Sequence, residues 1–177
     1  MLKTLWIAPV VVILGLGGLS GPLAADEEGT SLQAKLDGFG QVPPVITTGQ
    51  GTFRGHINAD GTISYKFTYS KLSATGVVSW ADIHFGQEQF TPNGIIYFFC
   101  ANSFPTGFIL PPGTPVPPPC PSTSATFTDT IRANNIVGPA VQGIAIHDLS
   151  AALQAFLHDA TYAQVHTAAF TGGEIRG

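Results

Sequence analysis

Five histidines are the side chains of this 177-residue sequence best suited to bind a metal ion or transfer a proton. The sequence contains none of the strong metal motifs HExxH, HxH or CxxC. Asp82 and His84 are two residues apart in an apolar stretch, so they would share one face of a strand. His166 lies in a second such stretch, and Glu174 and Arg176 lie in a third. If these strands are neighbours, the five side chains form one polar cluster.

Two interpretations of this cluster are open. In the first, His84 and His166 are nitrogen ligands of a transition metal, and Asp82 or Glu174 supplies an oxygen ligand. A copper- or zinc-type site of this kind would carry redox or hydrolytic activity. In the second, the cluster needs no cofactor, because each histidine donates to a carbonyl or carboxylate group and Glu174 pairs with Arg176 across the sheet.

Other chemical arrangements find little support in the sequence. There is no GxSxG nucleophile motif and no catalytic residue is predicted, so a non-enzymatic protein is favoured. His56 beside a turn and His158 at a helix end are expected in solvent. The formal net charge of −4, from 7 basic and 11 acidic residues, gives no positive surface for nucleic acid.

The N-terminus has the pattern of a secretory signal peptide. Lys3 provides the positive charge, residues 5–19 are apolar, and Ala24–Ala25 is a small-residue cleavage site. The alternative is an uncleaved membrane anchor, although the apolar run is shorter than a typical membrane span. We therefore expect a signal peptide over 1–25 and a single domain over 26–177, secreted or located in the periplasm or cell envelope, with no stable membrane span after cleavage.

Cys100 and Cys120 are expected to form a disulfide, because an exported chain with an even number of cysteines commonly pairs them. Metal binding by two thiolates is the alternative, but it needs further soft ligands nearby. The intervening 101–119 loop is rich in proline, which lacks the N–H donor needed in a sheet. Its apolar residues either bind a partner or fold back over a sheet edge; they are Phe104, Phe108, Ile109 and Leu110.

The remaining sequence predicts an all-β antiparallel sandwich or barrel. Short alternating or apolar runs are separated by turn residues, and the clearest hairpin surrounds Asp60-Gly61. On the run at 77–85, alternation would place Val78 on the same face as Trp80. One helix is expected near 149–158, with Asp148 or Ser150 as its N-cap. The predicted strands lie near 32–36, 53–57, 63–69, 77–85, 95–100, 125–131 and 162–166.

Several motifs in this order resemble the chordin-type (CHRD) domain. They are LDGFGQVPPV at 36–45, GQGTFRGHINADGTISYKFTY at 49–69, ADIHFGQEQFTPNGIIYFF at 81–99 and YAQVHTAAFTGGEIRG at 162–177. The resemblance implies an immunoglobulin-like β domain outside the cytoplasm, as in single-domain bacterial exported members. The family often has a second histidine at the position of Asp82, and members usually continue a few residues beyond the position of Gly177.

The favoured function is that of an exported β-sandwich that binds an extracytoplasmic protein, glycan or matrix component through its loops. Loops on a rigid sandwich are a common place for recognition. The alternative is the metal site around His84 and His166.

Overall fold

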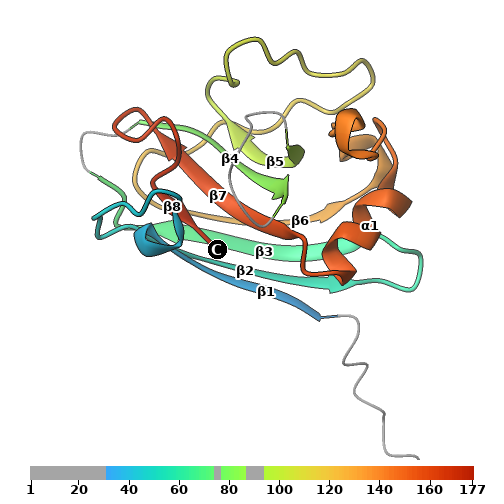
Figure 1. The fold of residues 1–177 in the computed structure, drawn as a ribbon, viewed down its shortest axis with the longest axis horizontal. Coiled ribbons are helices and arrows are strands. Elements are labelled where there is room, and N and C mark those ends of the chain that lie inside the picture. Colours follow the sequence, from blue (N-terminus) through green and yellow to red (C-terminus); the bar gives the residue numbers. More distant parts are fainter. Residues whose placement is uncertain (1–30, 74–76, 87–93) are drawn as a thin grey trace, which may run out of the picture.

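The computed structural model describes residues 31–73, 77–86 and 94–177 (Figure 1). The predicted signal peptide lies outside the described residues. Eight strands form one antiparallel sheet in the order β5-β4-β7-β8-β1-β2-β3-β6, which confirms the all-β fold. The strands are β1 (Ser31–Asp37), β2 (Gln50–Ile57), β3 (Ile63–Ser70), β4 (Val78–Phe85), β5 (Ile95–Ala101), β6 (Ala125–Ile131), β7 (Thr161–Thr167) and β8 (Ile175–Arg176).

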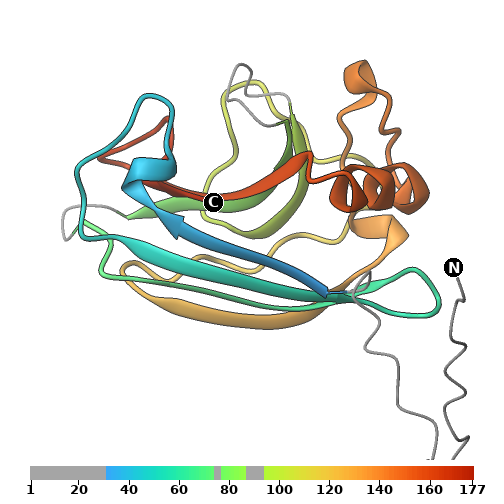
Figure 2. The same cartoon turned by 60° about the horizontal axis from the view of Figure 1, so that its bottom comes forward.

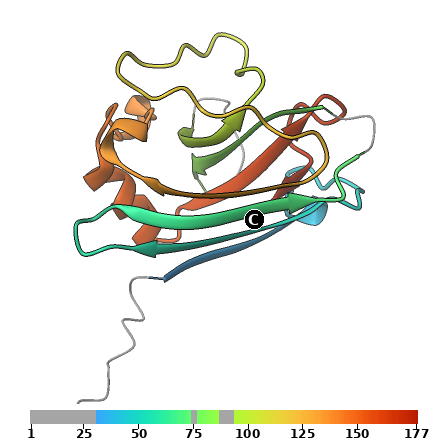
Figure 3. The ribbon, with the colours of Figure 1, turned by 180° about the vertical axis from the view of Figure 1, so that it is seen from behind.

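The sheet bends into two facing layers that nearly make a barrel (Figure 2). One layer contains β1, β2, β3 and β6, and Figure 3 shows its outer side. The other layer contains β4, β5 and β7. The short strand β8 joins the layers, because Arg176 pairs with Asp37 of β1 on one side and with Gln164 of β7 on the other.

Aromatic side chains from both layers fill the space between them. Phe67 of β3 stacks on Phe99 of β5 with ring centroids 3.9 Å apart. Beside them, the hydroxyl groups of Tyr65 and Tyr97 lie 2.9 Å apart in a buried hydrogen bond. The period-two alternation of the sequence therefore has the expected result on β3, where every second side chain enters the core.

Strand β4 carries apolar side chains on its core face, and Asp82 and His84 lie with Trp80 on the opposite face. Ala81 and Ile83 belong to the main core, whereas Trp80 packs in a smaller apolar cluster on the other side. The prediction that Val78 shares the face of Trp80 is wrong. The register with β7 shifts between these two residues, and this irregularity lets Val78 join the main core.

Within the described residues, one α-helix, α1 (Leu149–Leu157), closes one end of the molecule, as the sequence predicts (Figure 1). The side chain of Asp148 caps it by accepting a hydrogen bond from the N–H of Ala151. Phe156 anchors the helix in the core, whereas Leu157 remains exposed.

The Pro-rich loop between β5 and β6 is fixed at its base. Cys100 and Cys120 form the predicted disulfide. Asn102 adds hydrogen bonds, since its side-chain amide donates to the carbonyls of Val78 and Cys120 and its oxygen accepts from the N–H of Cys120. The loop then passes over the outer side of β5 and β4 (Figure 1).

Candidate metal centre

Asp82, His84 and His166 lie together on the face of the sheet opposite the main core. Asp82 and His84 are two residues apart on β4 and therefore share one face. His166 of β7 is paired with Trp80 of β4 in the sheet. Asp82 is therefore the diagonal neighbour of His166 across the ladder, within reach of its side chain. One ligand atom from each of the three residues lies within 4.8 Å of the other two. The structure thus brings together three of the five residues of the predicted cluster.

The carboxylate of Asp82 lies between the two imidazoles. The Nε2 atom of His84 is 3.1 Å from Oδ2, and the Nε2 atom of His166 is 3.6 Å from Oδ1. Neither contact has the geometry of a hydrogen bond, and among the described residues both oxygens and both Nε2 atoms have no hydrogen-bond partner. Buried polar atoms are nearly always paired, so this group has the character of a ligand set.

The spacing of these atoms also fits a single metal ion. Imidazole nitrogen and carboxylate oxygen bind Zn²⁺ at about 2.0–2.1 Å, so two ligands lie about 2.9 Å apart at a right angle and about 3.4 Å apart at a tetrahedral angle. The separations of 3.1 and 3.6 Å between Asp82 and the two histidines are close to these values. All three ligand atoms lie within 4.8 Å of one another, so shifts of the side chains would bring them around one ion.

All three residues are withdrawn from solvent. Asp82 is 0% exposed, and His84 and His166 are each 4% exposed. Burial raises the pKa of the Asp82 carboxyl, but the adjacent imidazoles of His84 and His166 outweigh this effect, and the pKa is lowered to about 2. Asp82 is therefore a carboxylate at neutral pH, and a buried carboxylate requires a positive partner.

A backbone contact fixes the ring of His166. Its Nδ1 atom lies 2.9 Å from the carbonyl oxygen of Thr171, so Nδ1 carries the proton and donates it. In the neutral ring the lone pair is then on Nε2, the atom that faces Asp82. Metal-binding histidines are commonly oriented in this way by a second hydrogen bond.

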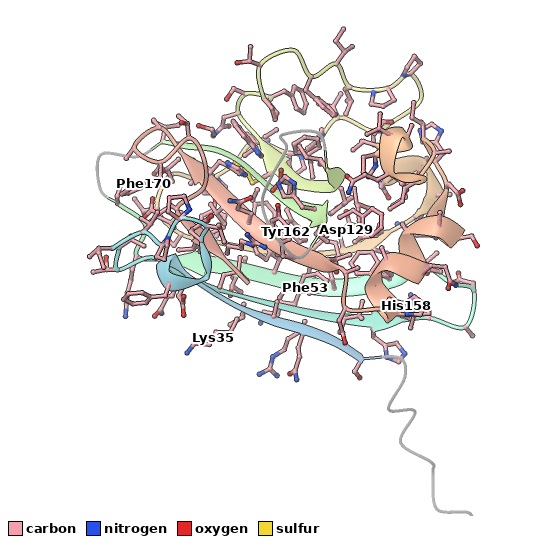
Figure 4. The ribbon with its side chains drawn as sticks, viewed as in Figure 1. Lys35, Phe53, Asp129, His158, Tyr162 and Phe170 are labelled. Atoms are coloured by element: carbon pink, nitrogen blue, oxygen red, sulfur yellow. A yellow bond between two sulfur atoms is a disulfide. The ribbon has the colours of Figure 1, made fainter. Side chains whose placement is uncertain are left out.

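Aromatic rings cover both histidines. The indole of Trp80 stacks on His166 with centroids 4.3 Å apart, and Tyr162 stacks on His84 at 4.9 Å. The guanidinium carbon of Arg176 lies 3.7 Å above the ring of Tyr162, which is labelled near the centre of the molecule in Figure 4. Arg176 is therefore adjacent to the centre through Tyr162 and supplies positive charge nearby.

Glu174 belongs to a different set of contacts. Its Oε1 accepts hydrogen bonds from the hydroxyl of Thr47 at 2.6 Å and from the N–H of Ser73 at 2.8 Å. Its Oε2 accepts one from the hydroxyl of Thr167 at 2.9 Å. The carboxylate thus ties two loops to the end of β7 through neutral donors.

The histidines expected in solvent are exposed. His56 is on β2, and His158 follows α1 at the right of Figure 4, far from the end of the molecule that carries Phe170. Neither belongs to the cluster of Asp82 and its two histidine neighbours.

The apolar side chains of the Pro-rich loop mostly cover the sheet. Phe104 and Phe108 meet the ring of Phe98 edge-on, at centroid distances of 5.3 and 5.1 Å, and Leu110 packs against the same cluster. Ile109 is 85% exposed. Of the two arrangements that the sequence left open, the loop adopts the one that folds back, and it does not present a continuous patch of four residues.

Several residues around the centre could not be assigned from the sequence. Trp80 and Tyr162 were part of alternating strands, which indicates burial but not contact with a particular histidine. Thr47 and Ser73 lie in loops far from Glu174 in sequence. For Trp80 and Tyr162 the missing information was the β4–β7 register, which places Trp80 opposite His166 and Tyr162 opposite His84.

Comparison with known proteins identifies the family. Among the described residues, no helix is long and apolar enough to cross a membrane. A search of the curated proteins and a search of the solved structures returned no match. The sequence model of the CHRD domain, by contrast, matches residues 32–177, which include all of the described chain except Ser31. The chain therefore belongs to the CHRD domain family.

Proposed function

We propose that this CHRD domain binds a divalent transition-metal ion through Asp82, His84 and His166. The observation that carries the proposal is the buried carboxylate between two imidazole Nε2 atoms, with none of these four atoms hydrogen-bonded within the described residues. Two imidazoles and one carboxylate suit zinc, copper, iron or nickel. Both cysteines are in a disulfide, so no thiolate competes for a softer ion.

The described residues supply three ligands, which leaves room for a further ligand on the metal. Catalytic zinc sites keep a water molecule in such a position, whereas structural zinc sites are closed by four protein ligands. The ligand number therefore supports hydrolytic chemistry with zinc, or redox chemistry with copper or iron, as activities to assay once the ion is known.

Calorimetric titration of metal-free protein with Zn²⁺ and Cu²⁺, followed by metal analysis after dialysis, tests the proposal. We expect one ion per chain. Asp82→Asn keeps the side-chain volume and removes the charged ligand, so binding should weaken by at least tenfold. His158→Asn is the matched control because it removes an exposed histidine, and its affinity should equal that of the wild type. Equal affinity of the Asp82→Asn variant would refute the assignment.

Binding of an extracytoplasmic partner through the loops is the second candidate function. The residues that support it lie between β1 and β2, and not in the Pro-rich loop. Phe39 and Ile46 are 71% and 84% exposed in the segment between β1 and β2, and Val42 between them is also exposed. Exposed apolar groups of this kind are typical of recognition surfaces. We place this surface outside the cytoplasm, as the disulfide and the family suggest.

Capture from a cell-envelope extract on immobilised domain tests this second candidate. A double Phe39→Ser, Ile46→Ser variant should lose a partner that the wild type retains. Ile109→Ser changes an equally exposed apolar residue in another loop and serves as the control. Retention by the double variant would exclude the β1–β2 segment as the recognition surface.

A further inference from the structure

The turn between β7 and β8 contacts both the candidate metal centre and the loops at one end of the molecule. On one side, the carbonyl of Thr171 accepts the hydrogen bond from Nδ1 of His166. On the other, the turn leads into Glu174, whose carboxylate is fully buried. Figure 1 shows the turn and the short 3₁₀ helix η1 (Gly38–Gly40) at the same end of the molecule, opposite α1.

The turn itself is tightly closed. The N–H of Phe170 donates to the carbonyl and hydroxyl oxygens of Thr167, and the N–H of Gly173 donates to the carbonyl of Phe170. Gly173 has a φ of +116°, and a Cβ atom there would collide with the side-chain amide of Gln164. A turn with this packing has little freedom to adjust at one end without moving the other.

Glu174 connects the turn to the two neighbouring loops. Its Oε1 is shared by the hydroxyl of Thr47, which precedes β2, and the N–H of Ser73, which follows β3. The same hydroxyl of Thr47 accepts from the N–H of Gly49. One carboxylate therefore holds both loops, and its own position depends on the hydroxyl of Thr167, the residue next to His166.

A second connection runs through two buried glutamines. The side-chain amide of Gln164 donates to the carbonyl of Gly172 in the turn and to Oε1 of Gln41, each at 2.8 Å. Gln41 directly follows η1, the part of the loop end that carries exposed Phe39. The turn is thus tied to the first loop at two places, through Gln41 and through Thr47.

We infer that metal binding fixes the β7–β8 turn and thereby regulates the loops at the end opposite α1, which contain Thr47, Gly49 and Ser73. This inference rests on the proposed function. A metal ion on Nε2 of His166 leaves Nδ1 as the ring position for the proton and makes it a stronger donor to Thr171. The turn is then held closed, and with it Glu174 and the segments that contain Thr47, Gly49 and Ser73. Because such coupling is reciprocal, a partner on the loop end would in turn tighten metal binding.

Amide hydrogen exchange, followed residue by residue by NMR with and without saturating Zn²⁺, tests the inference. Zn²⁺ is expected to slow the exchange of Gly173, Ser73 and Gly49 by about tenfold, a usual size for coupling between sites. His158→Asn should behave as the wild type. If calorimetry shows that Zn²⁺ binds, but exchange slows only in β4 and β7, the inference is overturned and the proposed function stands. If neither Zn²⁺ nor Cu²⁺ binds, the proposed function itself fails.

A pair of threonine variants tests the route. Thr47→Val keeps the shape of the side chain and removes its hydroxyl, so the slowing by Zn²⁺ should disappear at Gly49 but persist at Ser73, which still donates to Glu174. Thr48→Val is the matched control, because that hydroxyl donates to the carbonyl of Lys71. In Thr48→Val, Zn²⁺ should still slow the exchange of both the Gly49 and the Ser73 amides. Unchanged slowing at Gly49 in Thr47→Val would show that the route does not pass through this hydroxyl.

Discussion

The indole of Trp80 and the imidazole of His166 face each other across the β4–β7 ladder, stacked at a centroid distance of 4.3 Å. This relationship makes Trp80 a reporter of anything bound at His166. The sequence has 2 tryptophans, and the other is Trp6 in the predicted signal peptide. A chain cleaved after Ala25 would therefore contain Trp80 alone.

Cu²⁺ should quench the fluorescence of Trp80 because a paramagnetic ion on Nε2 of His166 would be within a few ångströms of the indole. The decrease should saturate at one equivalent of Cu²⁺ in a fluorescence titration of the cleaved chain. In His166→Asn the saturable decrease should vanish. A decrease of the same size and midpoint in that variant would locate the copper elsewhere.

Zn²⁺ should stabilise the folded protein by mass action, since the three proposed ligands are assembled only in the native state. At a free Zn²⁺ concentration of 100 times the Kd, the free energy of unfolding should rise by about 2.7 kcal/mol. Urea denaturation of metal-free and zinc-loaded protein measures the change. Asp82→Asn should lose most of it, whereas His56→Asn, in which an exposed histidine is replaced, should retain it.

The buried tyrosines should make the protein sensitive to alkali. Burial raises the pKa of Tyr65 to about 12, from an ordinary value of 10.0, and it also raises the pKa of Tyr97, its hydrogen-bond partner. Between pH 10 and about pH 12 the unfolded chain loses tyrosine protons that the folded chain keeps, so the free energy of unfolding falls as pH rises. Below pH 10 the contribution is fully present.

Urea denaturation at a series of pH values from 8 to 12 checks this expectation. In the double variant Tyr65→Phe, Tyr97→Phe both hydroxyls are removed together, so neither is left without its partner. Its decline in stability above pH 10 should be shallower than that of the wild type. An equally steep decline would assign the alkaline sensitivity to other groups.

The Pro-rich loop should contribute to stability through its phenylalanines. Phe108 packs edge-on against Phe98 but remains partly exposed, so Phe108→Ala should cost about 2 kcal/mol, less than the 3–5 kcal/mol of a fully buried phenylalanine. Ile109→Ser in the same loop should change stability by less than about 0.5 kcal/mol, because its side chain is in solvent. Thermal denaturation of the two variants distinguishes a covering loop from an unattached one.

The disulfide should stabilise the same loop. It joins cysteines separated by 20 residues, for which chain-entropy arguments give a contribution of about 3 kcal/mol. A Cys100→Ser, Cys120→Ser double variant should unfold at correspondingly lower urea concentration. The comparison is made without metal, so that the result concerns the loop and not the centre. Equal stability of the two proteins would show that hydrogen bonds from Asn102 suffice to hold the base.

The sequence by itself determined the strands and the helix of this protein, and it favoured the disulfide over metal binding by the two cysteines. Alternation of apolar residues is a local property, and it correctly predicted a strand near 63–69, where β3 (Ile63–Ser70) lies. The capping of α1 by Asp148 is equally local, since the bonded residues are three positions apart. Asp82 and His84 could be placed on one face because the side chains of a strand repeat every second residue.

Only the tertiary structure decided which strands are neighbours and in what register. β7 lies between β4 and β8, and this arrangement brings His166 to Asp82 and gives Glu174 to Thr47 and Ser73. The shift that moves Val78 to the core also depends on pairing with β7. Pairing between distant strands depends on the packing of the whole core, and a one-residue change of register would reverse every face. Local patterns contain no such information. The sequence could name Asp82, His84 and His166 as candidates, but only the fold shows that they lie together as a proposed ligand set.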